Sequence, residues 1–497
     1  MTEPTGERDR RLGKIDELRR RGVDPYPVRF DRTVTLRELR DRYDGDLESG
    51  QELDTVERIA GRLLLIRRQG KLTFATVRDG TGSAQLFVSD DGLGDAQHAE
   101  FDDLDLGDWV GVEGTPMKTR RGELSVKITG FTLLAKALRP LPDKWHGLAD
   151  VDTRFRQRYV DLIANDDARR VFEIRFAAVA AIRRFLTERG FIEVETPVLH
   201  AIAGGATAEP FVTHHNALDI DLYLRVALEL PLKRLVVGGF EKVFEIGRVF
   251  RNEGLGTRWQ PEFTMLELYE AYADYTDMMT LTEEMVSEVA RAAVGTTVVE
   301  VAGQTIDLTP PWERRTMLDL IREHAGVEVH PAMPVEKLER VCDDLGVPHE
   351  AGWDPGKLVI EIYEKTTEAN LVGPVFVLDY PRDVSPLARA HRDDPALVER
   401  FEPVVRGAEL GNAFSELNDP VDQRARFEAQ AELAAKGDLE AHGFDHDYLR
   451  ALEYGLPPCG GLGMGVDRLA MLLAGVTSIR EVILFPHLRP EAQLGSE

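Results

Sequence analysis

The chain has 497 residues, of which 43% are hydrophobic and 30% are charged, and its formal net charge is −26. A chain of this length exceeds what one hydrophobic core organises, so we expect two or more domains. No uninterrupted apolar run approaches the ~20 residues of a membrane-spanning helix, and the charged N-terminus lacks the apolar segment of a secretory signal. These features disfavour membrane and secreted proteins, and we expect a cytoplasmic protein that needs a partner for any membrane role.

Cysteine is scarce, with only Cys342 and Cys459, which are far apart and lack metal-ligand spacing. This usage fits a reducing compartment and argues against a zinc site or a disulfide framework. The acidic net charge disfavours phosphate binding over the surface as a whole. Basic runs at residues 67–71 and 118–121 allow a basic face in the first quarter, although each run taken alone favours a solvated loop.

The first 138 residues predict a helix followed by a small barrel. In residues 1–50, Leu12, Ile15 and Leu18 recur at helical spacing in an arginine-rich segment, which predicts a helical extension or a solvated capping helix. Residues 51–138 carry short β-branched runs punctuated by glycine, which predict strands at 59–66, 72–77, 84–88, 109–113 and 124–134. Five such strands favour the OB-fold barrel, which binds oligonucleotides on one face.

A hinge is predicted for residues 139–152, because Pro140 and Pro142 can continue neither a helix nor a central strand. An α+β domain is expected over residues 153–497. Its first elements are predicted as a helix at 171–189, a strand at 192–194 and a strand–loop–strand unit at 242–273.

Charged residues stand on both strands of that unit. Alternation along the first strand places Arg251 and Glu253 on one side, and the same rule places Glu267 and Tyr269 together on the second. Charge among Val, Phe and Leu is costly in a core unless it is paired. The sheet is therefore predicted to form the floor of a polar pocket, or else to contain a structural ion pair.

A further acidic group consists of Glu402, Glu409 and Glu416, which are seven residues apart. They would share one face of a helix, although the neighbouring residues also allow extended backbone. Repeated carboxylates suit a divalent cation that bridges phosphates, with Mg²⁺ as the usual ion. The alternative is acidic surface.

The stretch 455–463 is rich in glycine and proline, and the apolar run 466–473 that follows contains Arg468. Glycines allow backbone to approach a ligand, and an arginine at a helix start can clamp a phosphate. An ordinary loop before a core helix is the alternative reading of this stretch alone.

Three of these segments together resemble the motifs of the class II aminoacyl-tRNA synthetases: 190–197 resembles motif 1, 250–263 motif 2 and 461–468 motif 3. Shorter matches resemble the lysyl-tRNA synthetases and lie at 139–144, 156–159, 204–206, 213–216, 232–235, 264–269 and 414–419. The resemblance implies an OB-fold anticodon-binding barrel and a catalytic domain built on an antiparallel sheet flanked by helices. It also implies a homodimer through motif 1.

The resemblance implies a site for lysine. The ε-ammonium group would be held by Glu267, Tyr269, Asn412 and Glu416, the α-amino group by Gly205 and Glu229, and the carboxylate by Arg251. An ammonium group offers three donors and no acceptor, so carboxylates, a tyrosine hydroxyl and an amide carbonyl complement it.

The resemblance also implies an ATP site and a reaction. The catalytic residues would be Arg251 at the α-phosphate, Glu253 at the adenine amine and Arg468 at the ring and γ-phosphate, with Phe263 stacked on adenine and Glu402 and Glu409 ligating Mg²⁺. The lysine carboxylate would attack the α-phosphorus in line, without a general base. The 3′-hydroxyl of tRNA(Lys) would then take the lysyl group.

In the barrel, the resemblance assigns Phe74 and Gln85 to the uridine-rich anticodon, with Arg67 and Glu123 nearby. Aromatic stacking with hydrogen bonds to base edges is how single-stranded loops are generally bound. The alternative for Phe74 is a place in the barrel core.

Four residues depart from the family pattern. Trp259 and Gln260 stand where the family has His and Asn, and we expect Arg258 to replace the phosphate contact of that His. Pro231 stands in place of Tyr, which would alter the helix start and the aim of Glu229. Glu209 replaces Arg. These changes leave open a diverged paralogue with altered inhibitor sensitivity or another lysyl acceptor, and a catalytically weak RNA-binding relative.

Overall fold

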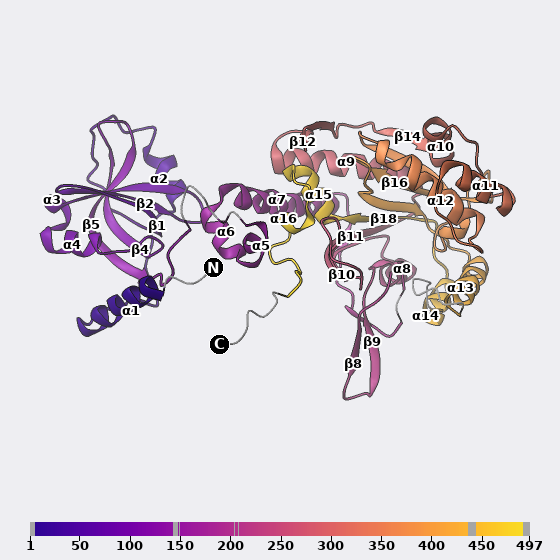
Figure 1. Ribbon diagram of the computed structural model, residues 1–497, viewed down its shortest axis with the longest axis horizontal. Helices are drawn as coiled ribbons and strands as arrows, with labels where there is room; N and C mark the ends of the chain where they lie inside the picture. The colour runs from indigo at the N-terminus through magenta and orange to yellow at the C-terminus, as the bar shows by residue number, and fades with distance from the viewer. Residues whose placement is uncertain are drawn as a thin grey trace. The chain divides into compact units, whose positions relative to one another are not determined.

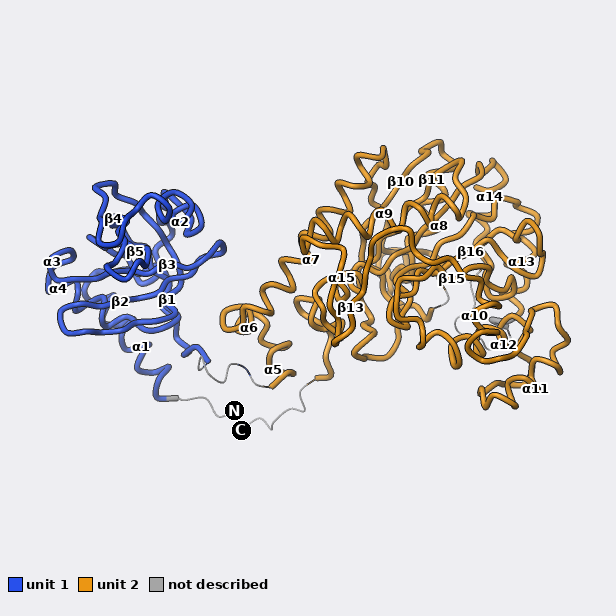
Figure 2. Tube along the Cα trace, turned by 90° about the horizontal axis from the view of Figure 1, so that it is seen from above, with its two compact units in different colours: residues 1–148 blue, residues 149–497 orange. Residues whose placement is uncertain are grey.

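The computed structural model describes residues 5–142, 148, 150–202, 204–206, 208–435 and 444–490 (Figure 1). It forms two compact units, residues 1–148 and residues 149–497 (Figure 2). The predicted hinge, 139–152, lies partly outside the described residues. None of the helices in the described part of the chain is both long and apolar enough to cross a membrane.

The first unit contains the predicted five-stranded barrel, closed in the order β1-β2-β3-β5-β4. Its strands are β1 Glu57–Gln69, β2 Leu72–Arg78, β3 Ser83–Ser89, β4 Trp109–Lys118 and β5 Leu124–Ala135. Inward-facing residues alternate along them, so that Ile59, Leu63 and Val126 fill the interior. Short helices α2 Leu36–Tyr43, α3 Asp90–Leu93 and α4 Asp95–Asp102 accompany the barrel. The OB-fold prediction is confirmed.

The predicted arginine-rich helix is α1 Thr5–Arg20. It packs onto the barrel unit, because Ile15 is buried and Asp105 forms ion pairs with Arg10 at 2.6 Å and with Lys14 at 3.3 Å. A buried Lys136 pairs with the same carboxylate at 2.5 Å. The helix is therefore held by charge as well as by its apolar face, and it is not merely a solvated cap.

The second unit is built on an eight-stranded sheet in the order β14-β15-β16-β17-β18-β11-β10-β6. Its inner pairs are antiparallel, and only the pairs at the two edges, β14 with β15 and β6 with β10, are parallel. The strands are β6 Ile192–Glu193, β10 Lys242–Phe250, β11 Glu262–Ala271, β14 Glu313–Thr316, β15 Val375–Pro381, β16 Leu397–Val404, β17 Gly411–Ser415 and β18 Cys459–Gly465. The predicted antiparallel catalytic sheet is confirmed.

Helices cover this sheet. The main core joins the sheet to α7 Asp166–Glu188, α9 Tyr275–Val294 and α15 Val466–Ala474. A second apolar cluster joins it to α8 Glu229–Val237 and α14 His446–Glu453. The other elements are α5 Val151–Arg156, α6 Arg158–Ala164, α10 Met317–Ala325, α11 Val335–Leu345, α12 Pro355–Thr366, η1 Glu368–Asn370, η2 Arg382–Val384, α13 Pro420–Ala435, α16 Ile479–Val482, β7 Leu199–His200, β8 Val212–His215, β9 Ile220–Leu224, β12 Val298–Val301 and β13 Gln304–Asp307.

Three local predictions are corrected. The glycine-rich stretch continues not as a loop but as the central strand β18. Strand β10 ends at Phe250, so the alternation expected to place Arg251 beside Glu253 does not extend to them. The three acidic residues spaced by seven lie on extended backbone and not on one helix, since Glu402 is in β16 and Glu416 directly follows β17.

Candidate functional site

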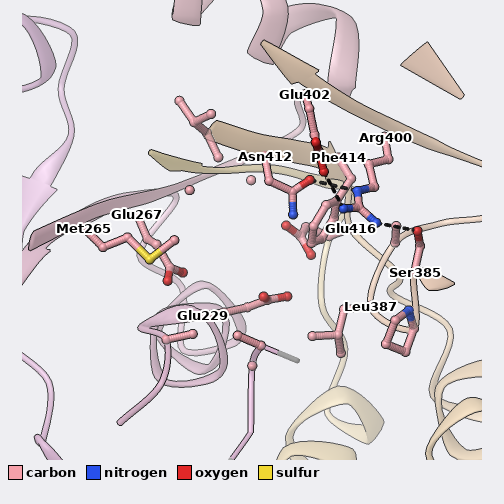
Figure 3. A pocket seen from close by; sticks show the side chains of 18 of the residues that line it. Glu229, Met265, Glu267, Ser385, Leu387, Arg400, Glu402, Asn412, Phe414 and Glu416 are labelled. Atoms are coloured by element: carbon pink, nitrogen blue, oxygen red, sulfur yellow. Dashed lines mark hydrogen bonds and ion pairs between the residues drawn. The ribbon is translucent and has the colours of Figure 1, made fainter. Parts of the chain in front are cut away.

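A cavity of about 250 Å³ opens above the middle of the sheet of the second unit (Figure 3). Its floor comes from β11, β16, β17 and β18, and one side comes from the start of α8. It is lined by every residue predicted to hold lysine and by both predicted metal ligands: Gly205, Glu229, Arg251, Glu267, Tyr269, Glu402, Glu409, Asn412 and Glu416. The tertiary structure therefore brings together residues that are up to 211 positions apart in sequence.

Glu267 lines this cavity and is buried. One carboxylate oxygen accepts a hydrogen bond from the Leu228 amide at 2.8 Å, and the other accepts one from the Tyr269 hydroxyl at 3.0 Å. Burial, and then repulsion by Glu229, raise the pKa of Glu267 to about 8. The predicted common face of Glu267 and Tyr269 is confirmed, and the carboxylate is placed to attract a cation.

Glu229 and Glu416 turn toward the same space as Glu267 (Figure 3). Glu229 begins helix α8, with Pro231 in its first turn. The first turn has amides without intrahelical partners, so a proline costs no hydrogen bond there, and the helix still starts at Glu229. The fully buried Lys233, whose role the sequence analysis missed, contacts Glu229 at 2.5 Å and also pairs with Glu416.

Arg400 is a second residue that the sequence analysis missed. It lines the cavity and donates hydrogen bonds to Asn412 Oδ1 at 2.9 Å and to Glu402 at 2.6 Å. The amide oxygen of Asn412, expected to face an ammonium group, is thus engaged, and its nitrogen points into the cavity (Figure 3). The sequence signal for Arg400 was its spacing of two residues from Glu402, which places both side chains on one face of a strand.

Two glycines keep space for this site. Gly205 has a φ of +94°, and a Cβ there would lie 3.2 Å from the Cβ of Ala227. A Cβ on Gly461 would lie 2.0 Å from a carboxylate oxygen of Glu416 and 2.5 Å from the ring of Tyr269. The glycines of β18 therefore leave the volume that the polar side chains occupy.

Of the residues predicted to bind ATP, some line this cavity and others lie outside it. Arg251 lines the cavity, and its guanidinium lies 5.2 Å from the centre of the Phe263 ring. Burial lowers the pKa of Arg251. Glu253 is exposed, lies in the loop after β10 and does not line this cavity.

A second cavity, of about 490 Å³, adjoins the first at Glu409, which lines both. Arg258 and Arg468 line it, and Arg468 donates to the Glu409 carboxylate at 3.2 Å. Trp259 also lines it and is 53% exposed. Its neighbour Gln260 is buried and accepts a hydrogen bond from the His487 amide at 2.9 Å, which gives this departure a structural role.

Glu402 and Glu409 are the two carboxylates that could hold a metal ion in this cavity. Burial, and then repulsion by Glu409, raise the pKa of Glu402 to about 7, and the two carboxylates are already paired with Arg400 and Arg468. Over the described ranges, no group of three or more His, Cys, Asp and Glu side chains is placed to hold a metal. Two carboxylates fit an ion such as Mg²⁺, which takes its other ligands from water and phosphate.

On the barrel, the predicted anticodon residues occur on neighbouring strands. Arg67 pairs with Phe74 across β1 and β2, and Phe74 pairs with Phe87 across β2 and β3. Gln85 accepts a hydrogen bond from Ser125 at 2.8 Å. The barrel-core reading of Phe74 is wrong, because its neighbours in β2 point inward.

Phe87 is an aromatic residue of this surface that the sequence analysis missed. Its ring lies edge-to-face with that of Phe74, with centroids 5.4 Å apart. Glu123 lies just before β5, and its amide donates to Thr119 Oγ1 at 3.1 Å. The sequence signal for Phe87 was its spacing of two residues from Gln85.

Comparisons with known proteins agree with this architecture. Residues 57–134 match a family described as OB-fold nucleic acid binding domain, and residues 150–489 match tRNA synthetases class II (D, K and N). The lysine–tRNA ligase of Moorella thermoacetica is 54% identical over 483 residues, covering 97% of this chain and 98% of its own. Those of Pelotomaculum thermopropionicum and Bacillus cereus are 52% and 50% identical, covering 97% and 96% of this chain and 94% and 96% of their own. The chain therefore belongs to the class II tRNA synthetases, in the family of the lysine–tRNA ligases.

Proposed function

We propose that this protein activates L-lysine with ATP to form lysyl-adenylate and then transfers the lysyl group to the 3′ end of tRNA(Lys). The observation that carries this proposal is the cavity in which Glu229, Glu267 and Glu416 converge beside Tyr269. A side chain ending in an ammonium group supplies a cation for Glu267, which has none paired with it among the described residues of the empty cavity, whereas a neutral side chain leaves the polar groups of the site without their partner. Selection of lysine follows from that difference.

The substrate is held at three points. Glu267, Tyr269 and Glu416 receive the ε-ammonium group, Gly205 and Glu229 receive the α-amino group, and Arg251 receives the carboxylate. Asn412 lines the same cavity, and its carbonyl would have to exchange its hydrogen bond with Arg400 to join the ε-ammonium ligands. In support, all seven residues line one cavity. Holding the carboxylate beside the phosphate site turns adenylation into a reaction between two positioned groups.

For ATP, Arg251, Arg258 and Arg468 bind the phosphates, and Phe263 and Glu253 bind the adenine. The lysine carboxylate attacks the α-phosphorus, a carboxylate–phosphorus bond forms, and pyrophosphate leaves. The arginines stabilise charge that develops on the phosphate oxygens. Glu402 and Glu409 would hold Mg²⁺, which, when bound, offsets the negative charge of the phosphates.

Arg67, Phe74, Gln85 and Glu123 bind the anticodon of tRNA(Lys) on the outer face of the barrel. The edge-to-face pair of Phe74 and Phe87 supports this proposal, because half-buried aromatic rings on a barrel surface provide stacking area for unpaired bases. The use of tRNA and two free, buried cysteines fit a cytoplasmic enzyme.

A homodimer through residues 190–197 completes the proposal. Ile192 in edge strand β6 is 48% exposed, and Leu199 and Val212 of the adjoining three-stranded sheet are 47% and 60% exposed. Exposed apolar residues clustered on one side of a chain mark a protein interface. The mass measured by light scattering tests this assembly.

Lysine-dependent exchange of pyrophosphate into ATP, with Mg²⁺ present, tests the activation step without tRNA. We expect exchange with lysine and none with neutral amino acids. Exchange followed by charging of tRNA(Lys) would support the whole proposal, and exchange without charging would favour another lysyl acceptor. Folded protein without lysine-dependent exchange would overturn the proposal in favour of an RNA-binding relative.

A further inference from the structure

Lys233 is a charged residue that the proposed reaction does not use. It stands one turn after Glu229 on helix α8, and its side chain has no exposed surface. A lysine is almost never fully buried unless its ammonium group is paired. The two partners of Lys233 are the carboxylates of Glu229, at 2.5 Å, and Glu416.

The two partner carboxylates come from different parts of the fold. Glu229 lies at the start of α8, and Glu416 follows β17. Within the part of the chain that the structure describes, Lys233 is the one cation paired with either carboxylate, and neither oxygen of Glu416 has a hydrogen bond of good geometry. The ammonium group therefore links the helix to the sheet at the edge of the cavity.

The cavity has more acidic than basic side chains. Five carboxylates line it, those of Glu229, Glu267, Glu402, Glu409 and Glu416, against the two cations Arg251 and Arg400. Lys233 reduces this excess of negative charge where Glu229 and Glu416 meet. Substrate lysine, with two ammonium groups and one carboxylate, brings one net positive charge, so without Lys233 the occupied site would keep more buried negative charge.

Other titratable groups that face Lys233 add no negative charge to this cluster. Tyr269 of β11, Tyr448 of α14 and Cys459 of β18 stay neutral, because burial raises the pKa of each side chain. Burial alone would lower the pKa of Lys233, but the attraction of Glu229 and Glu416 outweighs it and raises that pKa well above its ordinary value. The ammonium group of Lys233 therefore stays protonated and is the positive charge of this cluster.

We propose that Lys233 is a positioning residue of the lysine site, which braces Glu229 and Glu416 against each other and offsets their charge so that both can face the substrate's ammonium groups. The inference rests on the proposed function, because it concerns the same cavity. Without this ammonium group, a carboxylate of the empty cavity takes up a proton, and lysine has to displace that proton to bind.

The test compares Lys233→Met with the wild-type protein in lysine-dependent pyrophosphate exchange across the neutral pH range. We expect the KM for lysine to rise about tenfold or more, with the KM for ATP unchanged. The rise should grow as the pH falls, because lysine then competes with a more readily bound proton. A merely structural role would lower the amount of active enzyme without this split or this pH profile.

Arg234→Met is the matched control. It removes a positive charge from the neighbouring position of the same helix, where Arg234 pairs with Asp445 at 2.7 Å outside the cavity. We expect its KM for lysine to equal that of the wild type. If Lys233→Met does not fold, as judged by circular dichroism, Lys233→Gln replaces it, because the amide keeps hydrogen-bonding groups and removes only the charge.

A folded Lys233 variant with unchanged KM for lysine at every pH would overturn this inference and leave the proposed function standing. Failure of both Lys233 variants to fold, with Arg234→Met folded, would also overturn it, because the role would then be structural. A wild-type protein without lysine-dependent exchange would overturn the proposed function and this inference together.

Discussion

At the scale of single residues, Glu267 is the carboxylate on which the proposed recognition of lysine most depends. Its two oxygens are oriented by Leu228 and Tyr269, so the carboxylate is fixed before any substrate arrives. A buried site built to pair with a charged group rejects ligands that lack that group, because its own polar atoms are then left unpaired. Selectivity should therefore depend more on this carboxylate than on the size of the cavity.

Replacing Glu267 with Gln should abolish lysine selection while the fold stays intact. The amide has the same shape but no charge, so we expect lysine-dependent pyrophosphate exchange to fall by about a hundredfold or more. Thermal unfolding should be unimpaired, since Gln keeps the shape of the neutral acid that prevails in the empty cavity below about pH 8. Near-normal activation of lysine by this variant would contradict the assignment of Glu267.

The pH dependence of lysine binding should report the same carboxylate. Because the pKa of Glu267 is raised to about 8, the neutral acid prevails below that pH in the empty cavity. Lysine binding must then release a proton, so affinity should increase toward about pH 8, by at most about tenfold per pH unit, and then level off. Titration calorimetry measures this profile, and Glu267→Gln should weaken it, leaving the part due to Glu416, whose pKa burial also raises well above its ordinary value. A wild-type affinity independent of pH would show that Glu267 is ionised throughout.

At the scale of elements, strand β18 sets the floor of the site through its lack of side chains. Its pairing with β11 and β17 is regular, so backbone hydrogen bonds hold it in the sheet although glycine disfavours strands. The space that the missing side chains leave is filled by Glu416 and Tyr269 from the neighbouring strands. The composition of one strand thereby determines where the polar groups of two others can lie.

Gly461→Ala should therefore damage lysine binding. The added methyl group would overlap Glu416 Oε1 at 2.0 Å, and we expect the KM for lysine to rise about fivefold to a hundredfold. Gly130→Ala in β5 is the control, because a Cβ there meets nothing within 4 Å. Steady-state pyrophosphate exchange compares the two. Equal KM values for both variants would show that the site tolerates the methyl group.

At the scale of the whole molecule, the two compact units carry separate parts of the proposed reaction. The lysine cavity lies entirely within residues 149–497, whereas the anticodon residues lie within residues 1–148. Changes on the barrel should consequently affect tRNA and leave amino-acid activation alone.

Phe74→Ala tests this division. Loss of one stacking ring costs about 1–3 kcal/mol, so the KM for tRNA(Lys) should rise about fivefold to a hundredfold. Pyrophosphate exchange with lysine serves as the internal control and should stay at the wild-type rate. A loss of exchange in a folded Phe74→Ala protein would mean that the units do not act separately.

The sequence alone determined the features that depend on local order. Alternation and glycine spacing located the five barrel strands, and alternation in β11 placed Glu267 beside Tyr269. These features were predictable because neighbouring residues fix which side of a strand each side chain takes. The motif matches added the residues that are predicted to bind substrate lysine, and these residues line one cavity.

Only the tertiary structure decided the rest. Spacing by seven could not tell whether Glu402 and Glu416 lie on a helix or on strands, and a glycine-rich stretch reads as a loop until its partners β11 and β17 supply the hydrogen bonds. The partner of Lys233 in the sheet was equally hidden, because the contact with Glu416 spans 183 positions of sequence. Such contacts depend on how distant segments pack, and that packing, rather than any local pattern, sets the charge of the site.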